Sequence, residues 1–125
     1  MSVKLNHTIV HASDREATAA FLTGVLGLQE ATAYGPFLVV EVDNEVSLDV
    51  VQDSGTIRPQ HYAFLVSEDA FDEIFGRIRE RGLEHWADPF HRVPGEINTR
   101  DGGRGVYWDD PDGHNLEIIT RPYGG

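Results

Sequence analysis

Two histidines and two acidic residues occupy matching places in the two halves of this chain. His7 and His61 stand 54 residues apart, each beside an apolar run, while Asp49 lies in Ser-Leu-Asp-Val-Val and Glu117 in Asn-Leu-Glu-Ile-Ile. Neutral imidazole offers a lone pair and a carboxylate offers full charge, so two histidines with a carboxylate can hold a divalent ion and leave coordination positions for water or substrate. These four side chains can converge if the two halves pack beside each other around a pseudo-twofold axis.

The residues around Glu117 predict a β-hairpin. Asp110-Pro111-Asp112-Gly113 has the composition of a tight turn, and branched and aromatic residues fill Val106 to Asp109 and Asn115 to Thr120 on either side of it. Glu117 lies between Leu116 and Ile118, so it faces the opposite side of its strand. That side is either a solvated sheet face or a functional site.

The first half of the chain reads as strand, helix and three further strands. Val3 to Ala12 alternates, with His7, Ile9 and His11 on one face. Ser13 and Glu16 have the spacing of a capping box, which predicts that a helix starts there and that Gly27 ends it. The residues of the helix that recur at helical spacing, and are expected to face inward, are Ala17, Ala20, Phe21, Gly24 and Val25. The three later strands are expected at Gln29 to Ala33, Phe37 to Val42 and Glu45 to Val51.

The second half repeats this order. His61 to Ser67 reads as a strand ending in a serine cap, and Phe71, Ile74, Phe75 and Ile78 form the inner stripe of a helix that stops at Gly82. Ser13 and Ser67 differ by 54 positions, and Gly27 and Gly82 differ by 55. The chain is therefore expected to form one domain over residues 1–125, with modules at about 3–53 and 60–121 and a linker at 53–59.

Composition restricts the class of partner. The formal charge of −11 argues against a nucleic-acid partner, and the absence of cysteine excludes disulfides and thiolate metal sites. Neither a signal peptide nor an apolar segment long enough to cross a membrane is recognisable, so we expect a cytoplasmic protein without a membrane partner.

Several motifs together resemble the vicinal oxygen chelate superfamily, which includes glyoxalase I, fosfomycin-resistance transferases, extradiol dioxygenases and bleomycin-binding proteins. The similarity spans roughly Val3 to Arg121. The motifs are Asn6-His7, Leu26-Gly27-Leu28, His61-Tyr62-Ala63-Phe64, and Asp110-Pro111-Asp112-Gly113-His114 followed by Leu116-Glu117.

The resemblance implies an α+β fold of two βαβββ modules related by a pseudo-twofold, forming a curved mixed-sheet cup, usually in a homodimer. It implies that His7, His61 and Glu117 bind one divalent metal ion, which could be Fe2+, Mn2+, Zn2+ or Ni2+. Asp49 would lie near the place of a fourth ligand in glyoxalase I, as a base or water-bridging group if it does not coordinate. Tyr107 matches a substrate-contacting tyrosine of the fosfomycin branch or packs across the strands.

The expected function is that of a metal-dependent enzyme of glyoxalase or dioxygenase type acting on a small substrate with vicinal oxygens. The candidate catalytic residues that could move a proton are Tyr107, Asp49 and His11. The chain departs from the fosfomycin branch at His85-Trp86-Ala87-Asp88, where a substrate-binding lysine is expected. The alternative is a metal-free drug- or metabolite-binding protein like the bleomycin-resistance members.

The loop from Asp88 to Arg104 is expected to be extended. It is either simply exposed or a lid over the pocket, and an arginine in such a lid would suit a carboxylate or phosphate.

Overall fold

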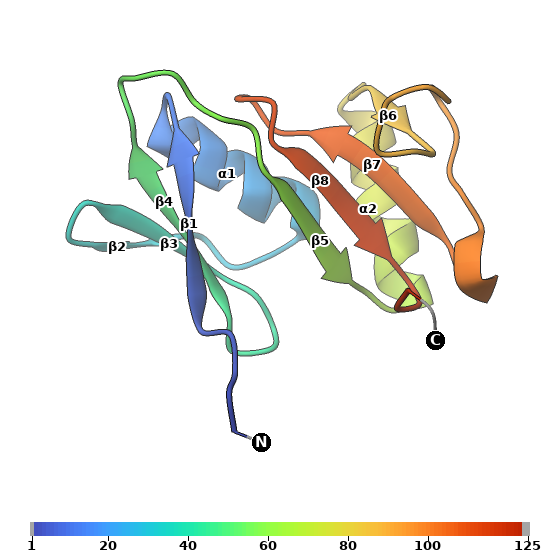
Figure 1. The fold of residues 1–125 in the computed structure, drawn as a ribbon, viewed down its shortest axis with the longest axis horizontal. Helices are drawn as coiled ribbons and strands as arrows, with labels where there is room; N and C mark the ends of the chain where they lie inside the picture. The colour runs from blue at the N-terminus through green and yellow to red at the C-terminus, as the bar shows by residue number, and fades with distance from the viewer. Residues whose placement is uncertain (1, 124–125) are drawn as a thin grey trace. The chain divides into compact units, whose positions relative to one another are not determined.

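The computed structural model describes residues 2–123 and divides the chain into two compact units, Met1–Arg58 and Pro59–Gly125. Each unit contains one α-helix and one four-stranded sheet, and the elements can be followed in Figure 1. The first unit holds β1 (His7–Ala12), α1 (Arg15–Leu26), β2 (Thr32–Tyr34), β3 (Phe37–Glu41) and β4 (Ser47–Gln52). The second holds β5 (His61–Leu65), α2 (Glu68–Glu80), β6 (His85–Trp86), the short 3-10 helix η1 (Arg100–Gly102), β7 (Gly105–Asp109) and β8 (Asn115–Ile119). The predicted α+β fold with two βαβββ repeats is confirmed.

Both sheets are mixed and share one topology. Their strand orders are β1-β4-β3-β2 and β5-β8-β7-β6, so the first and last strands of each unit lie side by side and parallel. The registers also correspond, because His7 pairs with Ser47 and His61 pairs with Asn115. Asp49 pairs with Ile9 and Glu117 pairs with Ala63, in each case two residues after the histidine. The sequence repeat is therefore a repeat of strand pairing.

The core of each unit lies between its helix and one face of its sheet. Val10, Val40 and Val50 of the first sheet are fully buried, and α1 contacts β1, β3 and β4. In the second unit, the stripe of Phe71, Ile74 and Ile78 on α2 is buried as predicted, whereas Phe75 is only half-buried. Val106, Trp108, Leu116 and Ile118 supply buried side chains from β7 and β8.

The helix starts differ between the two repeats. Ser67 caps α2 as predicted, accepting a hydrogen bond from the Ala70 N–H. The prediction that Ser13 caps the first helix is wrong, since Asp14 is the N-cap and its carboxylate accepts from the Ala17 N–H. Aspartate caps a helix as well as serine does, and here it stands one position closer to the first turn.

The predicted inner face of α1 is wrong in part. Val25 is buried as predicted, whereas Ala17 and Ala20 are exposed and Thr18, Ala19, Leu22 and Leu26 are buried instead. Alanine and threonine occur on both faces of this helix, so its apolar pattern specifies the orientation weakly. The two leucines bury more apolar area than alanines can, which favours the observed rotation. Gly27 ends the helix in the left-handed conformation, as expected.

The predicted hairpin of β7 and β8 is present and tightly organised. The carboxylate of Asp110 accepts the backbone N–H groups of Asp112 and His114, at 2.9 and 2.8 Å. Gly113 has φ 84, a conformation that glycine adopts without steric cost. His114 is buried, and its Nδ1 accepts the Gln60 N–H at 2.9 Å, so this histidine joins the turn to the segment before β5.

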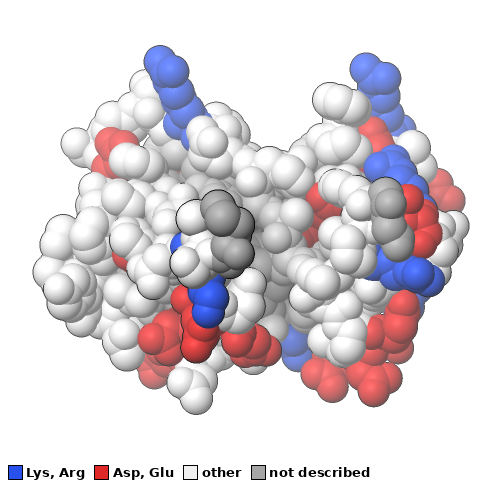
Figure 2. All heavy atoms as spheres, turned by 60° about the horizontal axis from the view of Figure 1, so that its bottom comes forward, with Lys and Arg blue, Asp and Glu red and all other residues white. Residues whose placement is uncertain are grey.

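Acidic and basic side chains both lie on the surface, although the net charge of the chain is negative. Figure 2 shows Asp and Glu side chains in clusters, with Lys and Arg projecting between them and uncharged residues over much of the visible face. The 21 acidic and 10 basic residues produce the net charge of −11. Within residues 2–123, no helix is both long and apolar enough to span a membrane.

Candidate functional site

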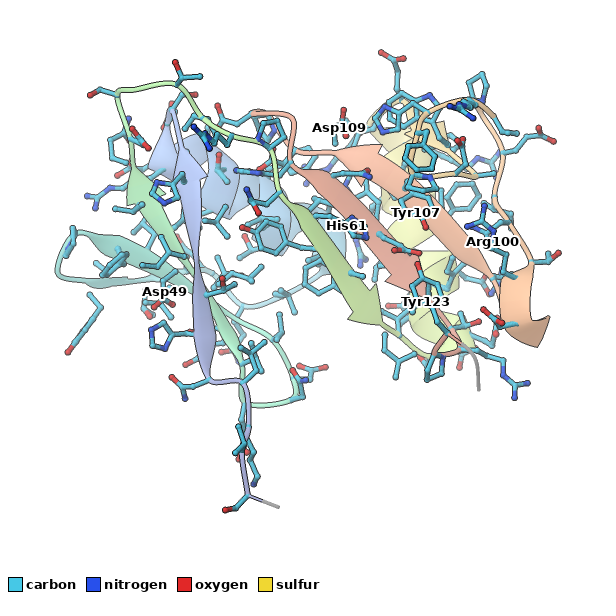
Figure 3. All side chains as sticks on the ribbon, in the orientation of Figure 1. Asp49, His61, Arg100, Tyr107, Asp109 and Tyr123 are labelled. Carbon is cyan, nitrogen blue, oxygen red and sulfur yellow. The ribbon has the colours of Figure 1, made fainter. Side chains whose placement is uncertain are left out.

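The candidate site of the second unit lies on the sheet face opposite its buried core. Side chains alternate along a strand, and paired residues share a face, so His61, Tyr107 and Glu117 project to the same side. Asp109 and Asn115 pair with each other and lie on that side too. Figure 3 shows His61, Tyr107 and Tyr123 close together there. Adjacent strands thus supply an imidazole, a phenol and a carboxylate to one surface.

The carboxylate of Glu117 is buried and bonded to an imidazole. Its residue is 1% exposed, and its Oε1 lies 3.0 Å from Nε2 of His61. On the opposite side of the ring, His61 Nδ1 lies 2.9 Å from the backbone oxygen of Asn115. A carbonyl oxygen only accepts hydrogen bonds, so Nδ1 of His61 carries a proton and donates it to the backbone oxygen of Asn115.

This arrangement fits a cation. A lone pair on Nε2 and a carboxylate oxygen are both acceptors, and the 3.0 Å contact between them is favourable only when a positive centre lies there. That centre is either a proton on Nε2 or a metal ion. Adjacent ligands around an ion with bonds of about 2.1 Å are about 3 Å apart at right angles. A histidine that donates its other N–H to a backbone carbonyl is also the usual form of a metal-binding histidine.

Two tyrosines complete the group around Glu117. The hydroxyl of Tyr123 donates to Oε2 of Glu117 at 2.5 Å and lies 3.2 Å from the hydroxyl of Tyr107. The rings of Tyr107 and His61 are stacked with centroids 5.9 Å apart. Burial raises the pKa of Tyr107, and the hydrogen bonds to Tyr123 and Glu117 raise it further. Tyr107 is therefore a neutral phenol at physiological pH, able to donate a hydrogen bond.

Sequence reasoning missed Tyr123. It lies beyond β8 in Arg121-Pro122-Tyr123, outside any periodic segment. Strand alternation therefore offered no signal for its position. Only the path of the chain after Ile119 reveals that this tyrosine returns to the carboxylate.

The first unit presents its own candidates on the matching face of its sheet. His7 is exposed, and its Nδ1 lies 2.7 Å from Oδ1 of Asn6, so Nδ1 donates to that oxygen as Nδ1 of His61 donates to Asn115. Asp49 accepts a hydrogen bond from the Ser47 hydroxyl at 2.8 Å. Asp49 therefore occupies the position of Glu117 in the strand register and accepts from a hydroxyl on its own strand.

His11, a candidate proton carrier, lies within hydrogen-bond distance of Asp53 in the first unit. Its Nδ1 lies 3.0 Å from Oδ2 of Asp53. A backbone hydrogen bond from Gly55 is the main cause that lowers the pKa of Asp53, and His11 lowers it further. Asp53 is therefore ionised at neutral pH and orients the imidazole of His11.

The structure brings together His61 and Glu117 of the predicted metal ligands. His7 lies in the first unit. Among residues 2–123, no three His, Asp or Glu side chains form a ready metal-binding group. The three-ligand site therefore stays a prediction.

The loop after β6 is fixed by its own contacts. The His91 ring stacks on the Trp86 indole with centroids 3.6 Å apart, and its Nε2 lies 3.5 Å from Asp109. Arg104 donates to Glu68 and Asp72 of α2, each at 2.8 Å, and its guanidinium lies over the Phe71 ring. Because its hydrogen bonds are made to α2, the guanidinium of Arg104 is already occupied by protein carboxylates.

The sequence of this chain matches the model of a known protein family. The model of the Glyoxalase/Bleomycin resistance protein/Dioxygenase superfamily matches residues 4–118. The chain belongs to this superfamily. The match includes both histidines, Asp49, Tyr107 and Glu117, so the resemblance seen in the sequence is confirmed.

Named proteins that are similar to this chain include two with solved structures and one transferase compared by sequence. Oxidase ChaP-H1 is 72% identical, with a TM-score of 0.97, over 99% of this chain and 100% of that one. Oxidase ChaP-H2 is 66% identical, also with a TM-score of 0.97, over 100% of this chain and 98% of that one. Metallothiol transferase FosB of Lysinibacillus sphaericus (strain C3-41) is 28% identical over 93% of this chain and 81% of the transferase.

Proposed function

We propose that this protein is a metal-dependent oxidase of the glyoxalase and dioxygenase superfamily, acting on a small molecule with vicinal oxygen atoms. The observation that carries the proposal is the 3.0 Å contact of His61 Nε2 with the buried carboxylate of Glu117, where a metal ion could take the place of a proton between the two atoms. High identity over the whole chain to proteins named as oxidases supports oxidation over other reactions of the superfamily.

In this proposal His61, Glu117 and His7 hold one divalent ion. The ion would supply Lewis-acid activation of chelated oxygens and, if it is iron, activation of dioxygen. His61 and His7 both keep a proton on Nδ1, which leaves Nε2 as the donor atom toward the ion. Glu117 contributes negative charge from a site closed to water, which strengthens its attraction for a cation.

The remaining residues handle the substrate. Tyr107 keeps its proton and donates a hydrogen bond to a substrate oxygen beside the ion, which stabilises charge developing on that oxygen. Asp49 and His11 are candidate proton acceptors in the first unit, His11 being oriented by Asp53. Simple catechols are suitable probe substrates because their two hydroxyls are adjacent. Hydroquinones are useful beside them because their hydroxyls are oxidisable but not adjacent.

The decisive experiment is metal analysis of protein purified without a histidine tag, followed by titration of the metal-free protein with Fe2+, Mn2+, Zn2+ and Ni2+. We expect one ion per chain, and oxygen uptake with a catechol probe only in the presence of the active metal. Glu117→Ala should lose at least about a hundredfold in metal affinity, since it removes a charged ligand. Glu73→Ala, on the exposed face of α2, is the matched control and should bind normally.

Circular dichroism of both variants keeps the result interpretable. Folded Glu117→Ala protein with wild-type metal content would remove Glu117 from the site. Wild-type protein that binds none of the four ions, yet binds a cationic drug such as bleomycin, would instead support the metal-free binding function of other superfamily members.

Transfer of a thiol to fosfomycin is a second candidate function, favoured by 28–29% identity to FosB and FosA proteins over more than nine-tenths of the chain. Incubation with fosfomycin, a thiol and Mn2+ tests it directly. Product formation there without oxygen uptake on catechols would replace the oxidase proposal. We also propose that the protein is a homodimer, which light scattering of the purified protein checks.

A further inference from the structure

The second oxygen of Glu117 points to a role for the C-terminal segment. Oε1 faces His61, and Oε2 accepts the hydroxyl of Tyr123 at 2.5 Å. A buried carboxylate has no hydrogen-bond donor of its own, so each oxygen requires a donor or a cation. Tyr123 satisfies the oxygen that does not face the imidazole.

Tyr123 is mostly exposed, yet its hydroxyl makes two contacts with buried residues. The residue is 60% exposed and lies four positions beyond the end of β8. Its hydroxyl nevertheless reaches both Glu117, which is 1% exposed, and the buried Tyr107. Ordering an exposed tyrosine costs side-chain entropy, so the two hydroxyl contacts must provide the compensation.

We propose that Tyr123 is a positioning residue that fixes Glu117 as a one-oxygen ligand. By occupying Oε2, it leaves Oε1 as the atom available beside His61 Nε2. It also holds the carboxylate plane, because Oε2 cannot rotate toward the ion without losing a short hydrogen bond. The role rests on the proposed metal-binding function and concerns how the ion is held, independently of which substrate is oxidised.

Hydrogen-bond partners of metal-binding carboxylates affect affinity in a known range. Their removal typically weakens metal binding by about 10- to 100-fold. Tyr123→Phe removes only the hydroxyl and keeps the ring, so it isolates the hydrogen bond. Tyr34→Phe is the matched control, because Tyr34 in β2 is 76% exposed and also loses only a hydroxyl.

The test is a competition titration of Mn2+ against a fluorescent chelator, with wild type, Tyr123→Phe and Tyr34→Phe measured together. We expect the Mn2+ dissociation constant of Tyr123→Phe to rise about 10- to 100-fold and that of Tyr34→Phe to stay within twofold. Substitution with Co2+ gives a second measurement, since the visible absorption bands of bound Co2+ report ligand geometry. Those bands should shift in Tyr123→Phe alone.

The outcomes separate this inference from the proposed function. If the wild-type protein binds neither Mn2+ nor Co2+, the metal function fails and this role with it. If wild type binds but Tyr123→Phe keeps its affinity and Co2+ spectrum, the positioning role is overturned while the metal function stands. An equal loss in Tyr34→Phe would also overturn it, since the effect would then not depend on Glu117.

Discussion

Tyr107 and Glu117 face each other across the antiparallel pair of β7 and β8, and the hydroxyl of Tyr123 lies within hydrogen-bond distance of both side chains. The phenol of Tyr107 thus lies beside Glu117, while the hydroxyl of Tyr123 is the donor to Oε2 of that carboxylate. In the proposed function Tyr107 contacts the substrate and Glu117 binds the ion.

Tyr107→Phe should therefore affect turnover more than metal content. We expect kcat/KM to fall about tenfold, the loss of one hydrogen bond worth about 1.4 kcal/mol, with the metal dissociation constant within threefold of wild type. Oxygen uptake with the probe substrate and metal titration check the two quantities. The opposite result would be a Tyr107→Phe protein that binds the metal weakly but has wild-type kcat/KM at saturating metal. That result would assign Tyr107 to metal binding and not to substrate contact.

Asp110 should stabilise the hairpin that carries Glu117. Its carboxylate is nearly buried and accepts the backbone N–H groups of Asp112 and His114. Asp110→Ala leaves both donors unsatisfied, so the free energy of unfolding should fall by about 2–3 kcal/mol. Asp110→Asn keeps one acceptor oxygen and should lose about 1 kcal/mol. Urea unfolding followed by tryptophan fluorescence measures both, and equal losses would argue against the hydrogen-bond explanation.

Asp88 should make stability depend on acid. Burial acts to raise the pKa of Asp88, but the N–H groups of Val93 and Arg92 outweigh it and hold the pKa below its usual range. The ionised form is therefore favoured in the folded state, and its contribution is fully present above the unfolded pKa of about 3.9. It is lost as the pH falls through the lower folded value.

The stability difference between wild type and Asp88→Asn should accordingly be largest near neutral pH and shrink below about pH 4. Thermal unfolding of both proteins between pH 2 and 7 provides the comparison. A difference that grows on acidification would mean that the folded-state pKa is raised.

Arg104 should contribute to stability and not to ligand binding. Its guanidinium is bonded to Glu68 and Asp72 and lies 4.3 Å from the Phe71 ring centroid. Both carboxylates are more than half exposed, so water screens the ion pairs, and Arg104→Ala should lose only about 1 kcal/mol. Arg104→Lys keeps the charge but not the planar guanidinium, so its free energy of unfolding should lie between those of wild type and Arg104→Ala. Unchanged stability with weakened substrate binding would contradict this assignment.

The fold was largely readable from the sequence because the informative signals are local. Alternation in Asn115 to Ile119 and the turn residues Asp110 to Gly113 specify the hairpin, and the spacing between His7 and His61 reveals the repeat. The buried face of α1 was not readable, since its alanines and threonines tolerate either orientation. Tyr123 was not readable either, because its contact with Glu117 depends on the path of an irregular segment.

Burial of Glu117 illustrates the same limit. Alternation correctly separates it from Leu116 and Ile118, yet all three are buried. A two-residue period distinguishes the faces of a sheet but not what covers each face. The tyrosines beside Glu117 and the orientation of His61 toward it only emerge in three dimensions.

Each sheet draws all four of its strands from one half of the chain, with its first and last strands adjacent. An ancestral polypeptide of half this length would thus have contained every strand of its own sheet. Gene duplication and fusion of such a polypeptide would require little more than a short connection, such as the one between Gln52 and His61. The two halves now differ at the matching register position, which holds Asp49 in one and Glu117 in the other.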